Sequence, residues 1–291
     1  MQKSFPKLIV SLLLFGSNGI VASQIALAST EISFLRALIG SLLLLGIFFR
    51  KRGRFSFQRY PKDAVCLLLS GVSMGASWLF LYEAYQQVGV STTILLHYTA
   101  PAIVLLLSPV FFQERLTMRK CLGLFIVLLG VFCINGQAAE AGKSDWGIFC
   151  AVLSAVLYVV MVISNKKVKQ VGGLENTVLQ MVFAFLVMLI FFLLRGKALL
   201  FTIPAESIPF VLLLGIVNGG IANYLYFSSI GKLPVQTVAV CSYLDPLTAV
   251  LLAALLLGEP MGALQLMGAA CILGGAIFAE LAGERKKEMT V

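Results

Sequence analysis

The sequence predicts an all-α membrane protein with ten transmembrane helices, built as two inverted five-helix repeats. Three observations predict this class: long apolar blocks, an uneven distribution of basic residues, and an internal repeat. Of the 291 residues, 59% are apolar and 12% are charged, whereas about 25% are charged in an average soluble domain. Because about 20 apolar residues span a bilayer as a helix, this composition favours a membrane bundle over a large soluble helical core.

Ten apolar blocks supply the expected helices. Eight contain no charged residue, and the other two contain one each: Arg36 in 32–49 and Asp245 in 233–258. The charge-free blocks are 8–30, 64–82, 84–113, 121–139, 146–165, 176–194, 207–231 and 260–279.

The first block admits a second interpretation. It follows Lys3 and Lys7 and contains the run Ala26-Leu27-Ala28, as in a cleaved signal peptide. Cleavage would leave nine helices and break the internal repeat. We therefore interpret this block as a retained first helix.

Basic residues favour one side of the expected membrane. If the N-terminus is cytoplasmic, 18 of the 22 Lys and Arg residues fall in inside segments, Arg36 falls within a helix, and only Lys143, Arg195 and Lys197 fall outside. This is the positive-inside bias of a chain with both termini in the cytoplasm. We therefore attribute the net charge of +9 to topology and anionic lipid headgroups, and expect no nucleic-acid partner. The expected location is the cytoplasmic (inner) membrane.

The chain repeats itself. A shift of 145 residues places Tyr98 on Tyr243 and Pro101 on Pro246, and a shift of 144 places Arg36 on Gln180. Charged and turn-forming residues do not recur in register through apolar composition alone. The expected parts are a first five-helix repeat at 7–136, a linker at 137–145, a second repeat at 146–282 and a cytoplasmic tail at 283–291.

Five helices in each half have a topological consequence. Because five is odd, the second half enters the membrane from the opposite side. Inverted repeats are typical of secondary transporters, in which exchange of conformation between the halves opens the middle to each face in turn. Some channels also contain inverted repeats, so a channel stays an alternative.

Several motifs resemble a known family. They are 96–101 (LHYTAP), 112–117 (FQERLT), 243–246 (YLDP) and 258–260 (GEP). These segments resemble the EamA family of the drug/metabolite transporter superfamily, and the resemblance covers essentially the whole chain. It implies ten helices, a central cavity between the halves, and transport driven by protons or by exchange. Members move amino acids, amines, sugars, nucleotide-like metabolites and drugs, so the substrate stays open.

Asp245 is the first candidate for the substrate site. It lies about ten residues into the expected ninth helix, which is roughly 15 Å and near the midplane. A carboxylate at that depth is costly and favours a functional role, as a site for a substrate amine or a proton. Pro246 frees a backbone carbonyl beside it. The structural alternative is an ion pair with Arg36 or a helix-end hydrogen bond.

His97 and Glu83 are weaker candidates. His97 is the only histidine, and its imidazole suits proton coupling or simple packing. Glu83 has Trp78, Tyr82 and Tyr85 nearby in sequence, which suits a cation site with aromatic walls or an interfacial aromatic belt. The expected substrate-binding residues are Asp245, His97, Tyr98, Trp78, Tyr82, Glu83, Tyr158, Asn223, Tyr224 and Tyr243.

A second group is expected to be structural. Arg36 either holds a substrate carboxylate or locks helices together through Glu31 or another acid, and we favour the second role. Glu114 and Glu259 suit the positive ends of helix dipoles. The expected structural or helix-end residues are Arg36, Glu114, Glu259, Pro101 and Pro246.

A membrane enzyme is the main rival class. The chain has one histidine, no His-Glu-x-x-His, no Cys-x-x-Cys and no phosphate-binding loop, and its six cysteines form no close metal-type pair. We therefore expect no enzyme activity, metal or cofactor. The expected function is secondary active transport of a small organic solute, such as an amino acid, an amine or a similar metabolite or drug. Its partners are the lipid bilayer and, as a candidate, protons; the oligomeric state is left open.

Overall fold

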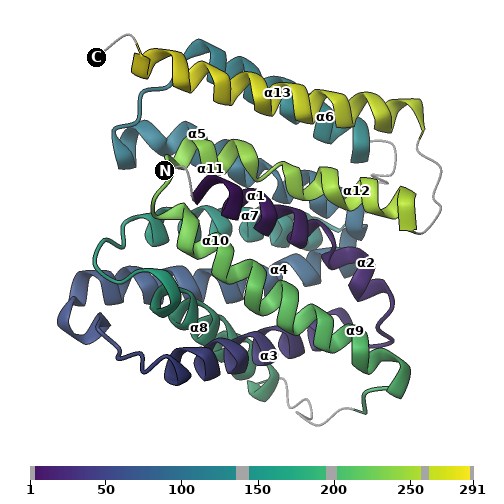
Figure 1. Ribbon diagram of the computed structural model, residues 1–291. Coiled ribbons are helices and arrows are strands. Elements are labelled where there is room, and N and C mark those ends of the chain that lie inside the picture. Colours follow the sequence, from purple (N-terminus) through teal and green to yellow (C-terminus); the bar gives the residue numbers. More distant parts are fainter. Residues whose placement is uncertain (1–3, 136–143, 195–201, 257–261, 289–291) are drawn as a thin grey trace.

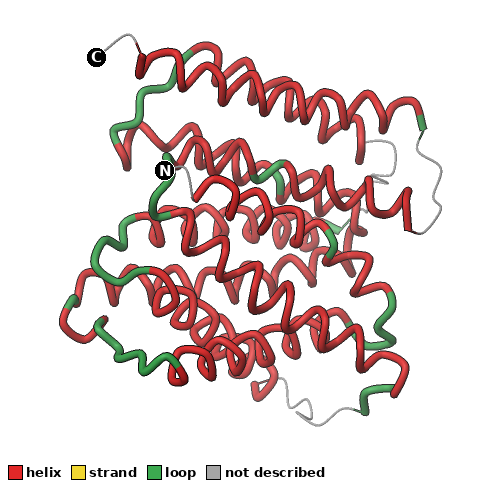
Figure 2. The backbone as a smooth tube through the Cα atoms, viewed as in Figure 1, coloured by secondary structure: helices red, strands yellow, loops and turns green. Residues whose placement is uncertain are grey.

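The structure is a computed structural model that describes residues 4–135, 144–194, 202–256 and 262–288. Within these ranges it is helical and contains no strand (Figures 1 and 2). The helices are α1 (Ser4–Gly16), α2 (Asn18–Ser23), α3 (Ser29–Arg50), η1 (Phe57–Arg59), α4 (Pro61–His97), α5 (Thr99–Phe112), α6 (Met118–Asn135), α7 (Asp145–Lys166), α8 (Gly173–Leu194), η2 (Ala205–Ser207), α9 (Ile208–Leu213), η3 (Leu214–Ala222), α10 (Asn223–Ile230), α11 (Val235–Cys241), α12 (Leu244–Leu256) and α13 (Ala263–Glu288).

The helices run side by side in one bundle, and α1 begins at the same end at which α13 finishes (Figure 1). Within the described residues, seven helical segments are long and apolar enough to cross a membrane, so this is a multi-pass membrane protein. Two further apolar helices, Thr99–Phe112 and Leu266–Ala279, are shorter. The count of ten therefore stays a prediction. The seven segments are Ser4–Ser23, Ser29–Arg50, Pro61–Val88, Asp145–Lys166, Gly173–Leu194, Ala205–Ile230 and Val235–Leu256.

One expected helix boundary was wrong. We expected the third helix to end near Glu83, but α4 continues without a break to His97. Glutamate is a good helix former, and Glu83 accepts a hydrogen bond at 3.2 Å from Gln87 one turn later. A single charged residue therefore does not end this helix.

Both repeats break their helix just before a proline. α4 gives way to α5 at Tyr98, and α11 gives way to α12 at Ser242 and Tyr243. Pro101 and Pro246 lack the N–H that would bond the carbonyl four residues earlier. The Tyr243 hydroxyl donates to the Tyr98 carbonyl at 3.0 Å, so the two breaks contact one another.

Two other segments depart from regular α-helix. The first span is interrupted at Ser17, between α1 and α2, and η3 is a π-helix of 9 residues between α9 and α10. The Asn223 amide donates to the carbonyls of Asn218 (2.9 Å) and Gly219 (3.0 Å). This side chain thereby pairs backbone groups that the irregular turn leaves free.

Glycines bring helices of the two halves into close contact. A Cβ on Gly71 of α4 would lie 2.6 Å from Cβ of Phe183 in α8, and one on Gly215 of η3 would lie 2.6 Å from Cβ of Ile39 in α3. A shift of 144 residues carries Gly71 onto Gly215 and Ile39 onto Phe183. The second contact is therefore the first with the two halves exchanged. Small residues permit this approach without a large hydrophobic driving force.

The α6–α13 pair shows the same exchange. A Cβ on Gly123 of α6 would lie 2.8 Å from the Gly275 carbonyl of α13, and one on Gly130 would lie 2.6 Å from the Gly268 carbonyl. A shift of 145 residues carries the first contact onto the second. These two helices therefore approach through glycine on both sides.

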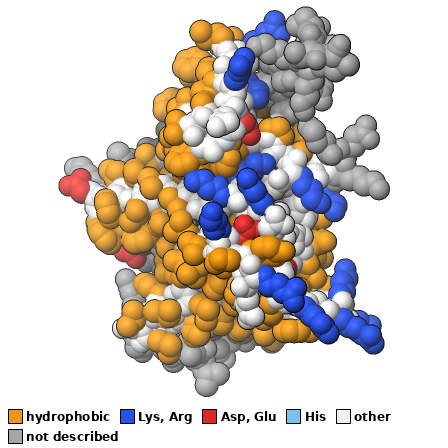
Figure 3. Space-filling view, turned by 90° about the vertical axis from the view of Figure 1, so that its left-hand side faces the viewer, with side chains coloured by type: hydrophobic (Ala, Val, Ile, Leu, Met, Phe, Trp, Pro, Cys, Tyr) orange, Lys and Arg blue, Asp and Glu red, His pale blue; other side chains and the backbone are white. Residues whose placement is uncertain are grey.

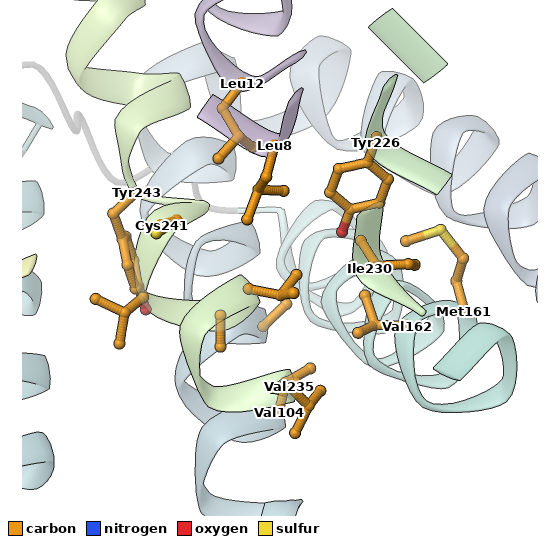
Figure 4. Close-up of a cluster of buried hydrophobic side chains, with 14 of the residues drawn as sticks. Leu8, Leu12, Val104, Met161, Val162, Tyr226, Ile230, Val235, Cys241 and Tyr243 are labelled. Atoms are coloured by element: carbon orange, nitrogen blue, oxygen red, sulfur yellow. The ribbon is translucent and has the colours of Figure 1, made fainter. Parts of the chain in front are cut away.

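The main core includes the contact between α1 and helices of the second half. Leu8 and Leu12 are buried among Tyr226, Ile230 and Tyr243 (Figure 4). The outer faces of the bundle carry large exposed apolar side chains, such as Val110 at 75% and Leu255 at 78% exposure. This arrangement suits a bundle whose solvent is lipid.

Candidate functional site

Asp245 lies in the first turn of α12, directly after the helix break. Its carboxylate is hydrogen-bonded by the Tyr98 hydroxyl and feels the charge of Arg36. The backbone there is close to α1, since a Cβ on Gly16 would lie 2.8 Å from the Asp245 carbonyl. Asp245 therefore interacts with or lies close to three elements: α1, α3 and the α4–α5 junction.

Three further tyrosine hydroxyls lie near this carboxylate. Tyr85, Tyr158 and Tyr226 are all close enough to feel the charge of Asp245. The hydroxyls of Tyr158 and Tyr226 lie 3.1 Å apart. The charge of Asp245 therefore reaches tyrosines of α4, α7 and α10, and the Tyr98 hydroxyl contacts it directly.

A small pocket opens beside this cluster. Its walls are packed so closely that it has no room for even a water molecule, whereas sites for drug-sized ligands hold roughly 300–1,000 Å³. Its lining residues are Pro101, Val104, Tyr158, Val162, Tyr226, Val238, Ala239 and Ser242.

His97 is the last residue of α4 and packs into the same region. Its Nδ1 lies 2.9 Å from the Ser154 hydroxyl, and its ring lies edge-on to Tyr158 with centroids 5.5 Å apart. Because a serine hydroxyl can donate or accept, this contact suits either tautomer of the neutral ring.

Arg36 is held against an aromatic face. Its guanidinium carbon lies 4.3 Å from the centroid of the Trp78 ring, within cation–π distance. Its Nε is buried and has no hydrogen-bond partner. Glu31, the partner that we expected for it, accepts instead from the Ala28 backbone at the start of α3 at 3.0 Å.

Glu83 lies apart from the Asp245 cluster. It accepts from the indole N–H of Trp146 at 3.3 Å, so its aromatic partner contacts it through a polar edge. Tyr82 and Tyr85 pack edge to face with centroids 5.7 Å apart. Of the two, Tyr85 feels the charge of Asp245.

The remaining expected binding residues use their side chains mainly for structure. Tyr243 is fully buried and donates to backbone. Asn223 pairs carbonyls of η3. Tyr224 is half-buried and packs against the main core. We therefore place these three residues around the site without assigning them to it.

Carboxylates join the two halves at the end of the bundle where the termini lie. Asp63 Oδ2 accepts from the backbone N–H groups of Lys169, Gln170 and Val171 at 3.1, 2.6 and 3.0 Å. This end carries many of the Lys and Arg side chains (Figure 3). We call it the basic end.

Two other carboxylates make equivalent contacts at the basic end. Glu114 accepts from the Val235 and Gln236 backbone N–H groups at 2.8 and 3.2 Å, and so binds the start of α11, not of its own helix. Glu175 accepts from Ser56 N–H and Phe57 N–H at 2.6 and 3.0 Å. Each carboxylate belongs to one half and binds backbone of the other. Glu259 lies outside the described residues.

Sequence reasoning missed Tyr226, Ser154 and Ser242. Tyr226 is two residues after Tyr224, and residues two apart on a helix face nearly opposite sides. Only one of this pair could therefore point to the site, and the sequence did not say which. Within the part of the chain that the structure describes, no three His, Cys, Asp or Glu side chains are grouped to hold a metal ion.

The fold and this cluster can now be compared with known proteins. The family model of the EamA-like transporter family matches residues 6–136 and again residues 145–281. The chain belongs to the EamA-like transporter family. The resemblance seen in the sequence motifs is thereby confirmed, and the chain contains two segments that the same EamA model matches.

Three relatives carry transporter names. An uncharacterized transporter of Bacillus subtilis, YxxF, is 26% identical over 98% of this chain and 91% of its own length. A probable terminal-alkyne amino-acid exporter of Streptantibioticus cattleyicolor is 26% identical over 94% and 88%. The threonine/homoserine exporter RhtA of Escherichia coli is 23% identical over 89% and 84%. All three names describe transport proteins.

One solved crystal structure shares the fold. It superposes with a TM-score of 0.82, covers 96% of this chain and 99% of that chain, and is 19% identical in sequence. At this identity the likeness shows the fold alone.

Proposed function

We propose that the protein is a secondary active transporter that moves a small organic solute across the cytoplasmic membrane by alternating access, driven by a proton gradient or by exchange. The solute is an amino acid, an amine or a similar metabolite or drug. The observation that carries the proposal is Asp245, a carboxylate at a helix break between the two halves of an EamA chain. An ionisable group in this position typically marks a substrate or ion pathway.

The exchanged glycine contacts support inverted repeats. Gly71 of the first half contacts Phe183 of the second, and Gly215 of the second contacts Ile39 of the first. Such reciprocity is expected when a two-fold axis relates the halves. Two halves related in this way have two near-equivalent arrangements, which is the physical basis of alternating access.

The basic end is the cytoplasmic end in this proposal. Lys and Arg gather there (Figure 3), as the positive-inside bias requires. The carboxylates Asp63, Glu114 and Glu175 tie the halves together at this end. We therefore assign the structure to a state closed toward the cytoplasm.

Two of the relatives are named for amino acids, so amino acids head the test panel. Purified protein is reconstituted in proteoliposomes loaded with unlabelled solute, and entry of labelled solute is followed. A carrier predicts saturable entry that internal solute accelerates, because the loaded site returns faster than the empty one. Entry that neither saturates nor responds to internal solute contradicts a carrier and favours a channel.

A further inference from the structure

Among the buried side-chain atoms without a hydrogen-bond partner, three belong to elements that pack around the α1–α2 break and α3. The buried atoms Nε of Arg36, Oδ1 of Asn18 and Oδ1 of Asn218 have no hydrogen-bond partner among the described residues. They comprise one free donor and two free acceptors. Because buried polar groups are paired in most structures, an unpaired set of both kinds indicates a place for a polar ligand.

The orientation of the Asn218 amide is fixed by its neighbours. Its Nδ2 donates to the Leu14 carbonyl at 2.5 Å and to the Ser17 hydroxyl at 3.1 Å. A carbonyl can only accept, so the amide cannot be turned over. Oδ1 of this fully buried residue is therefore the atom left free. Asn18 follows Ser17 directly and begins α2.

The same segment lies between Arg36 and Asp245. Gly219, next to Asn218, is close to Arg36: its Cβ position is 2.7 Å from the Arg36 carbonyl and 3.3 Å from Cγ. On the other side, the Cβ position of Gly16 is 2.8 Å from the Asp245 carbonyl. We call Asn18, Arg36, Asn218 and Asp245 the polar cradle.

Irregular backbone meets at the cradle. Asn18 stands at the break between α1 and α2, and Asn218 belongs to the π-helix η3. Transporters place their solute sites at interrupted helices, and π-helical turns are frequent at functional sites. The Trp78 ring holds the Arg36 guanidinium from one face, which leaves its edge for a ligand.

The charges of the cradle select the class of ligand. Arg36 and Asp245 are close enough to interact, and together they leave no net charge. An amine alone would pair only with Asp245 and leave Arg36 without a partner, and a carboxylic acid alone would pair only with Arg36. A ligand that carries both charges pairs with both residues.

We propose that the polar cradle binds the zwitterionic head of a free α-amino acid, an inference that rests on the proposed transport function. The α-carboxylate accepts from Nε of Arg36. The α-ammonium donates to Oδ1 of Asn18 and Oδ1 of Asn218, and the Asp245 carboxylate faces it. The side chain of the amino acid points toward the tyrosines around Asp245.

Binding to purified protein tests this directly. The chain has two tryptophans, so Trp146→Phe leaves Trp78 as the only indole to report occupancy by fluorescence. The probes are threonine, leucine and phenylalanine, each beside its decarboxylated amine and its deaminated acid. We expect at least one amino acid to bind roughly tenfold or more tightly than both of its analogues, since each analogue lacks a charge-assisted hydrogen bond.

Two matched variants assign the site. Asn18→Ala removes an oxygen that has no hydrogen-bond partner among the described residues, so the variant should fold as the unaltered chain does. It should bind the amino acid roughly tenfold more weakly. Ser41→Ala removes another buried unpaired oxygen of α3, outside the cradle, and should leave binding unchanged.

Three results overturn the proposal. They are that no amino acid binds more tightly than both of its analogues, that Asn18→Ala has no effect, and that no probe binds. If labelled solute still exchanges in proteoliposomes, these results reject the zwitterion site and leave the transport function standing. Absence of both binding and exchange rejects both.

Discussion

Two tyrosines at equivalent positions join the helix breaks. Tyr243 donates its hydroxyl to the carbonyl of Tyr98, and the Tyr98 hydroxyl in turn bonds Asp245. The Tyr98 carbonyl at the first helix break is therefore paired by the Tyr243 hydroxyl at the second break. This chain of contacts fixes the position of the Asp245 carboxylate from both halves.

Tyr243→Phe tests this contact. The substitution leaves the Tyr98 carbonyl without its donor in a buried place, which costs about 1–3 kcal/mol. We expect a lower midpoint of thermal denaturation in detergent, followed by circular dichroism. Tyr224→Phe serves as the control, because no hydrogen bond is seen for the Tyr224 hydroxyl among the described residues. Equal midpoints for the two variants would contradict the account.

At this scale the sequence pointed to some residues of the cluster and not to others. Asp245 stood out because it is a lone charge in an apolar block, and Tyr98 because it lies in a repeated motif. The free oxygen of Asn218 could not be predicted, since it follows from a contact with α1, 204 residues away in the chain. The free Nε of Arg36 likewise depends on Glu31 being used elsewhere.

At the scale of helices, glycine sets the distance between the halves. Gly75 of α4 is packed so closely on α8 that a Cβ would lie 2.7 Å from the Ala184 carbonyl and 2.9 Å from its Cα. Backbone atoms cannot turn aside as a flexible side chain can. The α4–α8 contact therefore depends on the absence of a side chain at this position.

Gly75→Ala should destabilise the protein by about 1–3 kcal/mol, because the added methyl group forces backbone apart. Gly46→Ala is the matched control: it lies in α3, and a Cβ there meets nothing within 4 Å. Alanine favours helix over glycine by up to about 1 kcal/mol, so this control should be neutral or stabilising. The measurement is thermal denaturation of both variants in the same detergent. A denaturation midpoint of Gly75→Ala equal to that of the unaltered chain would refute the close contact.

The contacts of Asp63 at the basic end provide a second test of how the helices are joined. Asp63 is 7% exposed and bonds three consecutive backbone N–H groups of the α7–α8 turn. Asp63→Asn keeps the shape but loses the charge, and should cost about 2 kcal/mol. Asp145→Asn, at an exposed position in the first turn of α7, should change the denaturation midpoint little. A midpoint for Asp63→Asn as high as that of the control would contradict a stabilising role for the Asp63 contacts.

Helix existence was easier to predict than helix continuity. Apolar blocks marked the spans because bilayer thickness fixes their length. The end of α4 was misplaced because charge was used as the boundary, whereas the break follows from the missing N–H of Pro101. The π-helix η3 left no recognisable sequence pattern, since its register depends on packing against α3.

At the scale of the whole molecule, the proposal requires that the two ends of the bundle face different compartments. Engineered cysteines at Ser144 and Gln170, in a chain whose six cysteines are replaced by alanine, test this. We expect a membrane-impermeant thiol reagent to reach Ser144→Cys from outside intact cells and Gln170→Cys only after the cells are opened. Reaction of both engineered cysteines from the same face would contradict the ten-helix topology.

The family, the helical class and the apolar blocks agree between sequence and structure, whereas the substrate and its energy source rest on the proposal. The Asp245 cluster joins the two halves through Tyr98 and Arg36. If this cluster is the solute site, its charge must matter for movement of solute and not for folding.

The most direct test is uptake in proteoliposomes under an imposed pH gradient, with Asp245→Asn beside the unaltered chain. The substitution preserves size and hydrogen-bonding capacity for Tyr98 but removes the charge. We predict saturable uptake by the unaltered chain, and loss of uptake in a variant that still elutes and denatures as a folded protein. Uptake by Asp245→Asn equal to that of the unaltered chain would contradict the central role of this carboxylate.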